Sequence, residues 1–262
     1  MPSWNSDQYL KFAEERTRPC RDLAGRIFVE RVQRIADLGC GPGNSTEVLA
    51  NRWPDAEITG VDNAAAMIGT ARREQPQHQW IESDIAGWAV AESRLFDVVF
   101  SNAALQWVPN HETTLPGLLA RTAPGGVLAF QVPANSDAPA HRLMRSMASS
   151  SEWLGQFPVG SVREWHVHDL SYYYDLLAPN CSRIDAWDTE YLQILPDAAA
   201  IVEWYRGSGL RPFLDALPTD VVRERFVAQY MEGIRELYPL RPDGRILFPF
   251  LRRFVIAYKP HE

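Results

Sequence analysis

The sequence predicts an α/β fold: a doubly wound, mostly parallel sheet of seven strands with a helical insertion in the C-terminal half. First, strand-like and helix-like segments alternate between residues 33 and 132, a succession typical of doubly wound sheets. Second, a glycine-rich turn, Gly39-Cys40-Gly41-Pro42-Gly43, directly follows the first strand-like run. Third, two more strand-like runs lie late in the chain, with helix-like segments between them.

Five apolar runs in the first half are typical of strands buried in a parallel sheet. In chain order they are "RIADL", "AEITGVD", "QWIESDI", "FDVVFSN" and "GVLAFQVP". The segments "NSTEVLANRW", "AAAMIGTARREQ" and "TTLPGLLARTAPGG" between them are expected to be helices or to contain one. Ser45 is expected to cap the first of these helices.

The second half is less regular. Residues 137–165 are expected to begin as a helix and end as a loop, and "SRIDAWDTEYLQIL" is expected to form a strand at the far side of the sheet. Residues 196–238 predict two or three helices interrupted at Pro212 and Pro218, and "RFVIAYK" predicts the last strand. The helices between these two strands are expected to form a lid.

Composition favours a small-molecule enzyme. The net charge of −7 disfavours a nucleic-acid partner, which needs clustered Lys and Arg. The three cysteines lie far apart, and no metal-ligand spacing is found; the histidines of "WHVH", spaced to share a strand face, lack the remaining ligands. Without a signal peptide or an apolar run long enough to span a membrane, a cytoplasmic protein is expected. The oligomeric state stays open.

The glycine turn narrows the choice of cofactor. Asn44 stands where the dinucleotide fingerprint requires its third glycine, and no Lys follows to form a phosphate-binding loop. Asp37, just before the glycines, would repel a pyrophosphate but suits a ligand with an ammonium group. Asp62 closes the second strand and can accept from both ribose hydroxyls, while Asp84 can accept from an adenine amine. S-adenosylmethionine carries these groups and fits better than NAD.

Several short motifs carry a family resemblance. "ADLGCGPG", "GVD" and "ESDI" resemble the first three motifs of class I S-adenosylmethionine-dependent methyltransferases, and "APGGVLAF" resembles their fifth-strand region. Over almost the whole chain, "WNSDQYLKFAEERTRP", "ADLGCGPGNST", "NAALQWV", "YYDLL", "SGLRP" and "YPL…ILFPFLRRFVIA" are similar to the trans-aconitate methyltransferase family. The late segments "SGLRP" and "LFPF" weigh most, because methyltransferases at large do not share them.

The resemblance implies three parts, a cofactor site and a product. Residues 1–30 would form a helical cover, 31–135 the cofactor-binding core and 136–262 the rest of the sheet with a helical substrate lid. The product would be a monomethyl ester of trans-aconitate, a small anionic tricarboxylate. The implied cofactor residues are Tyr9, Arg16, Asp37, Gly39, Gly41, Asn44, Asp62, Asn63, Met67, Asp84, Ile85, Asn102 and Ala103.

Methyl transfer to a carboxylate needs no general base, because an ordinary carboxylate with a pKa near ~4 is ionised at neutral pH. The site needs position and neutralising donors, which Arg supplies bidentately. The expected substrate residues are Gln106, Trp107, Tyr172, Tyr173, Trp204, Arg211, Tyr238 and Arg252. Another small carboxylic acid, a phenol or a carbon nucleophile stays open as acceptor. An NAD-dependent oxidoreductase and a non-catalytic cofactor-binding module are the alternatives from other classes.

Overall fold

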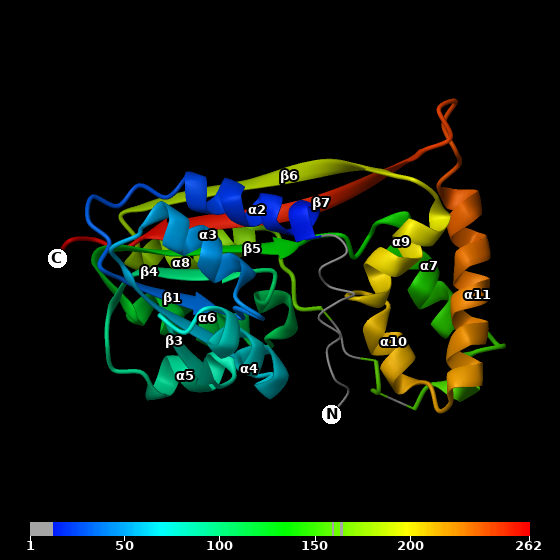
Figure 1. Cartoon of the computed structure of the whole chain (residues 1–262), viewed down its shortest axis with the longest axis horizontal. Coiled ribbons are helices and arrows are strands. Elements are labelled where there is room, and N and C mark those ends of the chain that lie inside the picture. The colour runs from blue at the N-terminus through cyan, green and yellow to red at the C-terminus, as the bar shows by residue number, and fades with distance from the viewer. Residues whose placement is uncertain (1–12, 159, 163–164) are drawn as a thin grey trace. The chain divides into compact units, whose positions relative to one another are not determined.

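The computed structural model describes residues 13–158, 160–162 and 165–262. Its sheet has seven strands in the order β3-β2-β1-β4-β5-β7-β6 (Figure 1). The strands are β1 (Arg34–Leu38), β2 (Glu57–Asp62), β3 (Gln79–Glu82), β4 (Phe96–Asn102), β5 (Thr122–Pro133), β6 (Arg183–Leu195) and β7 (Ile246–Tyr258). Strands β1 to β5 pair in parallel, and β7 pairs with β5 antiparallel. The predicted doubly wound, mostly parallel sheet is confirmed.

The topology marks one edge of the sheet for a ligand. Strand β1 pairs with β2 on one side and with β4 on the other, so the strand order reverses at β1. In open α/β sheets ligands bind outside the carboxyl ends of the strands at such a point. The carboxyl ends here are Leu38, Asp62 and Asn102.

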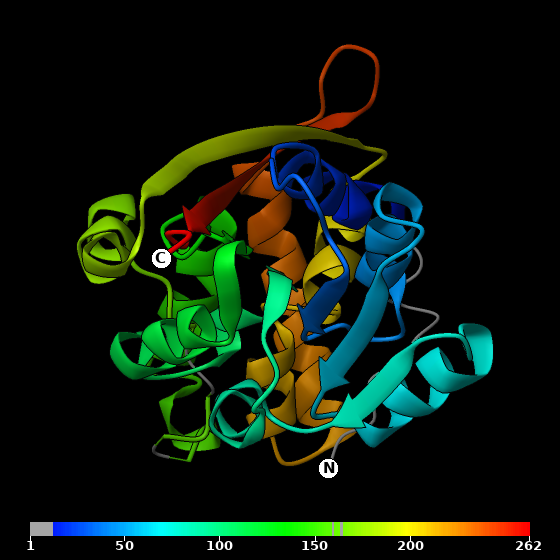
Figure 2. The same cartoon turned by 90° about the vertical axis from the view of Figure 1, so that its left-hand side faces the viewer.

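Helices cover both faces of the parallel part of the sheet. Helices α2, α3 and α4 lie on one face, and α5, α6 and α8 lie on the other (Figure 2). The helices are α2 (Ala13–Gly25), α3 (Asn44–Arg52), α4 (Ala65–Glu74), α5 (Ile85–Ala91), α6 (His111–Ala120), α7 (Pro139–Ala148), α8 (Leu170–Leu177), α9 (Ala198–Arg206), α10 (Arg211–Ala216) and α11 (Asp220–Leu237). In the described ranges, none of them is both long and apolar enough to cross a membrane.

The chain divides into two compact units. The sheet unit comprises residues 13–133, 166–189 and 252–262, and the described residues between these ranges form the helical unit. Strands β6 and β7 each run from one unit into the other along the chain. The two units alternate along the sequence. The expected division at residues 30 and 135 into a cover, a core and a lid-bearing part stays a prediction.

The helical unit has its own core. Helix α11 packs against α7 and α9 around buried aromatic side chains, among them Trp153, Trp204 and Tyr230. The two or three helices expected after Pro196 are three, α9 to α11. Pro212 lies in the first turn of α10, where the missing N–H costs nothing, and the Thr219 hydroxyl caps α11.

Three local expectations were wrong. Ser45 does not cap α3, because Gly43 in a left-handed conformation stands at the cap and the Ser45 hydroxyl bonds Asp37. The segment "QWIESDI" is not one strand: β3 ends at Glu82, and Asp84 caps α5 by accepting from Gly87 N. The histidines of "WHVH" do not share a strand face, since residues 165–169 form no strand.

Candidate cofactor and acceptor site

The glycine turn after β1 is held against the neighbouring strand. The N–H groups of Gly39 and Cys40 both donate to the Val61 carbonyl, at 2.7 and 3.1 Å. Gly39 has φ +71°, and a Cβ there would lie 2.1 Å from the Cβ of Ala104. Glycine at this position therefore lets the turn approach the segment that follows β4.

Gly41 leaves space beside the turn. Its φ is +56°, and a Cβ built on it would meet no atom within 4 Å. Its N–H donates to Oδ2 of Asp62 at 3.0 Å. Asn44 follows as the first residue of α3 and is partly exposed. The turn thus combines open space with exposed backbone, as close approach to a ligand requires.

Asp37 is a fully buried carboxylate under this turn. Its Oδ2 accepts from the hydroxyls of Ser45 and Thr46, both at 2.7 Å. Its Oδ1 is buried and has no hydrogen-bond partner among the described residues. Burial raises the pKa of Asp37 to about 6, against the two hydroxyl hydrogen bonds, which lower it. An unpaired buried carboxylate oxygen is suited to a cationic donor such as an ammonium group.

Asp62 ends β2 with both carboxylate oxygens held in place. Besides the bond from Gly41, Oδ1 accepts from Ala64 N at 2.9 Å. Burial raises the pKa of Asp62, while the N–H groups of Ala64 and Gly41 act in the opposite direction. Each oxygen keeps a further lone pair, so the carboxylate can accept from two neighbouring hydroxyls.

The remaining cofactor candidates after β2 and β3 differ in exposure. Asp84 is exposed, and its Oδ1 accepts from Gly87 N at 2.7 Å. Ile85 is buried next to it, and Asn63 is exposed while Met67 is buried. Their contact with a cofactor stays a prediction.

The segment after β4 has an unusual backbone. Ala103 has φ +56°, a left-handed conformation that a residue with a Cβ seldom adopts. Its N–H donates to the Gln131 carbonyl at 3.0 Å, and its carbonyl accepts from Nε2 of Gln106 at 2.7 Å. Oε1 of Gln106 is buried without a partner in the described structure, and Trp107 is half-buried. This local strain accompanies the candidate acceptor site.

Gln131 is a buried polar residue that the sequence reasoning missed. It lies fully buried in β5, between Asn102 of β4 and Arg252 of β7. The available signal was one polar residue inside the apolar run "VLAFQVP".

The two tyrosines at the start of α8 sit differently. Tyr173 is fully buried; its hydroxyl accepts from His168 N at 3.2 Å and lies 3.4 Å from Nδ1 of His111. Burial raises the Tyr173 pKa to about 12. The half-buried Tyr172 ring stacks on His168 at 3.9 Å between centroids. The Tyr173 hydroxyl thus already has partners inside the sheet unit.

Three substrate candidates belong to the helical unit. Trp204 and Tyr238 are buried in its core, at 2% and 7% exposure. Arg211 opens α10, and its Nε lies 3.4 Å from Oδ2 of Asp215. The structure therefore brings Asp37, Asp62, Asn102 and Arg252 together in one unit, while Trp204, Arg211 and Tyr238 share the other.

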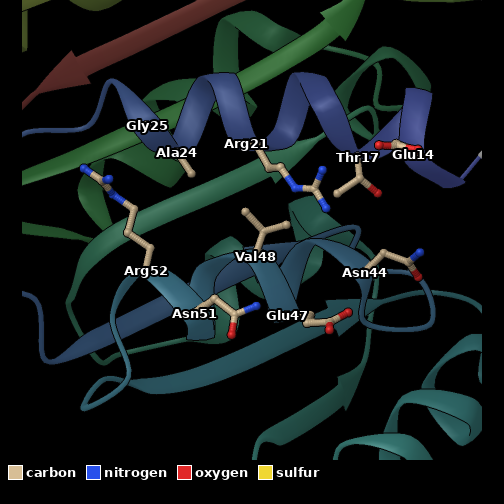
Figure 3. A pocket seen from close by; sticks show the side chains of 10 residues that line it. All are labelled: Glu14, Thr17, Arg21, Ala24, Gly25, Asn44, Glu47, Val48, Asn51 and Arg52. Carbon is tan, nitrogen blue, oxygen red and sulfur yellow. The ribbon is translucent and has the colours of Figure 1, made fainter.

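Two cofactor candidates lie outside the described residues: Tyr9, and the side chain of Arg16 in α2. Helix α2 packs along α3, and a groove of about 750 Å³ runs between them (Figure 3). Among the described candidates only Asn44 lines this groove, at the end where α3 begins. The candidate cofactor site is therefore defined by the strand ends rather than by the groove.

The strand-end residues fit S-adenosylmethionine. The unpaired Oδ1 of Asp37 matches an ammonium group, the fixed carboxylate of Asp62 matches a ribose, and the space beside Gly41 admits a ligand close to backbone. The two carboxylates at these positions disfavour a pyrophosphate by charge repulsion.

Comparison with known proteins identifies the family of this chain. A methyltransferase domain model matches residues 35–126. The trans-aconitate 2-methyltransferase of Azoarcus sp. strain BH72 is 47% identical over 99% of this chain and 100% of its own length. The chain belongs to the trans-aconitate 2-methyltransferase family. The family member from Yersinia pestis strain Pestoides F is 42% identical over 98% of this chain and 99% of its own.

The chain described here is therefore an S-adenosylmethionine-dependent methyltransferase. This confirms the predicted cofactor and decides against NAD chemistry. Solved structures share its fold at low identity. The YcgJ protein of Bacillus subtilis superposes with a TM-score of 0.59 at 13% identity, covering 94% of this chain and 100% of its own. A Haemonchus contortus phosphoethanolamine N-methyltransferase with bound S-adenosylhomocysteine gives 0.56 at 15%, covering 93% and 52%.

Proposed function

We propose that this enzyme transfers a methyl group from S-adenosylmethionine to one carboxylate of trans-aconitate and forms the monomethyl ester. The observation that carries the proposal is 47% identity to trans-aconitate 2-methyltransferases over nearly the whole of both chains. Such length includes the helical unit, which the matched methyltransferase domain at residues 35–126 does not reach.

In this proposal the strand-end residues hold the cofactor. Asp37 faces the ammonium group, Asp62 the ribose, and Asp84 with Ile85 the adenine. When bound, the cofactor supplies an electrophilic methyl group on a sulfonium. The chain's own task is to hold the accepting oxygen in line and free of water, and positioning of this kind contributes roughly 7–11 kcal/mol.

The acceptor brings its own negative charge. A carboxylate is already ionised at neutral pH, so no residue needs to remove a proton. The other carboxylates require neutralisation, and Arg211 and Arg252 are the proposed donors. Gln106, Trp107, Tyr172, Tyr173, Trp204 and Tyr238 are the proposed walls or further donors of the substrate site.

Transfer of labelled methyl from S-adenosylmethionine tests the acceptor, with trans-aconitate, cis-aconitate and citrate compared in parallel. Base-labile label that forms much faster with trans-aconitate is the expected result. Absence of label with all three acids, while S-adenosylhomocysteine still binds, would sink the acceptor assignment. Other small acids and phenols would then be tried.

Arg211→Lys tests the helical unit's part. Because Lys cannot pair bidentately with a carboxylate, kcat/KM for trans-aconitate should fall by about 10-fold or more. Affinity for S-adenosylhomocysteine, measured by calorimetry, should stay within about two-fold. Arg235→Lys, on an exposed position of α11, is the matched control and should leave both values unchanged. Unaltered kinetics for Arg211→Lys would remove Arg211 from the substrate site.

A further inference from the structure

Three side chains from adjacent strands form a continuous hydrogen-bonded chain in the sheet unit. Nε2 of Gln131 lies 2.6 Å from Oδ1 of Asn102, and Nη1 of Arg252 lies 3.4 Å from Oε1 of Gln131. Strand pairing sets this order, since Asn102 stands opposite Gln131 and Arg252 stands opposite Pro133. Gln131 is fully buried, and Arg252 is 6% exposed.

The cation at one end fixes the direction of every bond in the chain. A guanidinium can only donate, so the Gln131 atom that faces Arg252 must be the oxygen. The Gln131 amide nitrogen then faces Asn102, whose oxygen must accept. The Nδ2 group of Asn102 is left as the outer end, and it has no partner among the described residues.

Asn102, one of the cofactor candidates by resemblance, lies shortly before the substrate candidates Gln106 and Trp107 in the chain. It is the last residue of β4, on the carboxyl edge of the sheet. It is followed by the strained Ala103 and by Ala104, which borders the glycine turn at Gly39. A partly exposed amide at this position can reach a bound ligand, whereas Gln131 is fully buried.

We propose that the Arg252–Gln131–Asn102 relay determines the acceptor class: it presents Nδ2 of Asn102 as a donor to the carboxylate that receives the methyl group. The proposal rests on the proposed function. An ionised carboxylate only accepts hydrogen bonds, so it matches an N–H donor. An amine or amide acceptor needs an oxygen to receive its own N–H, and Oδ1 of Asn102 is turned toward the buried Gln131 instead. Asn102 is then a catalytic residue and Gln131 is a positioning residue, while Arg252 orients Gln131 in addition to its proposed part in neutralising the substrate.

Gln131→Glu tests the direction of the relay. Glutamate keeps the acceptor for Arg252 but, when ionised, cannot donate to Asn102, whose amide then turns its NH₂ inward and its oxygen toward the acceptor. With trans-aconitate, kcat/KM should fall by about 10- to 100-fold, the loss of one hydrogen bond to a charged group. Affinity for S-adenosylhomocysteine by calorimetry should change by less than about two-fold.

A buried glutamine that only stabilised the sheet could also lower activity when replaced, so the effect must be shown to act through Asn102. In an Asn102→Ala background, Gln131→Glu should change kcat/KM by less than about two-fold. Wild-type kcat/KM in Gln131→Glu would overturn the proposal. So would an equal loss from that change in both backgrounds.

If Gln131→Glu fails to fold or to bind S-adenosylhomocysteine, Asn102→Asp decides. This change keeps the shape but replaces the outer donor by an oxygen, and it should lose at least as much kcat/KM as Asn102→Ala. Near-wild-type activity of Asn102→Asp would refute the relay. The rate of the wild-type enzyme with trans-aconitate tests the proposed function. The ratio of kcat/KM between variant and wild type, measured with whichever acceptor is methylated, tests the relay separately.

Discussion

Replacing Asp62 by alanine is expected to weaken S-adenosylhomocysteine binding by at least about 100-fold, measured by calorimetry. The carboxylate is fixed at the end of β2 by the N–H groups of Gly41 and Ala64. Two hydroxyls of one ribose would each donate to it, and two hydrogen bonds to a charged group are together worth about 3–6 kcal/mol. The expected loss is therefore larger than for any neutral contact in the site.

Two controls separate loss of the ribose contact from general damage. Asp55→Ala removes an exposed carboxylate shortly before β2 and should leave the affinity unchanged. Thermal unfolding of Asp62→Ala without ligand should show a single cooperative transition, which would indicate that the variant is folded. Wild-type affinity in folded Asp62→Ala would remove Asp62 from the ribose site.

The sequence predicted the sheet well where burial on both faces decides the structure. The runs "RIADL" and "FDVVFSN" form β1 and β4 with the predicted bounds. A short continuous apolar run in an α/β protein is typical of a strand that is buried on both faces. Helix α5 was missed because its seven residues are too few to show a helical period. Asp84 before it is equally compatible with the end of a strand. Its signal was the cap, Asp84 three residues before Gly87.

The candidate site could be proposed from the sequence where its residues stand at a strand end, but not where they depend on partners across the sheet. Asp37 and Asp62 follow from their places beside the glycine turn. Nothing in the chain order joins Gln131 to Arg252, which are 121 residues apart and meet only through the β5–β7 pairing. Ser45 misled for the same reason: its hydroxyl has a partner in β1, and a local helix rule cannot include that partner.

Asp37 should make cofactor affinity depend on pH. Its pKa of about 6 lies above the ordinary value of 3.8, because burial penalises the carboxylate. A raised carboxyl pKa contributes stability that is complete below the unfolded value near 3.8 and is lost as the pH rises through about 6. At pH 7 the ionised carboxylate therefore costs the folded protein about 3 kcal/mol of stability relative to a carboxyl group with the ordinary pKa. An ammonium group against Oδ1 would offset that cost.

The affinity for S-adenosylmethionine should accordingly fall as the pH drops below about 6, by up to about ten-fold per pH unit. The cofactor's ammonium stays charged in this range, so Asp37 is the group that loses its charge. In Asp37→Asn the affinity should be lower at pH 7 and nearly constant between pH 5 and 7. Calorimetry over this range measures both curves.

5′-Methylthioadenosine is the matched ligand control, because it keeps the adenine, the ribose and the sulfur but has no amino-acid group. The affinity for 5′-methylthioadenosine should be unchanged in Asp37→Asn and strongly reduced in Asp62→Ala. The affinity for S-adenosylmethionine should be reduced in both variants. Any titration of Asp62, whose pKa is also raised by burial, affects both ligands and cancels in their ratio. A ratio that stays constant from pH 5 to 7 would mean that Asp37 does not meet the ammonium. The buried carboxylate would then serve only its bonds to Ser45 and Thr46, and its unpaired oxygen would have no function in binding.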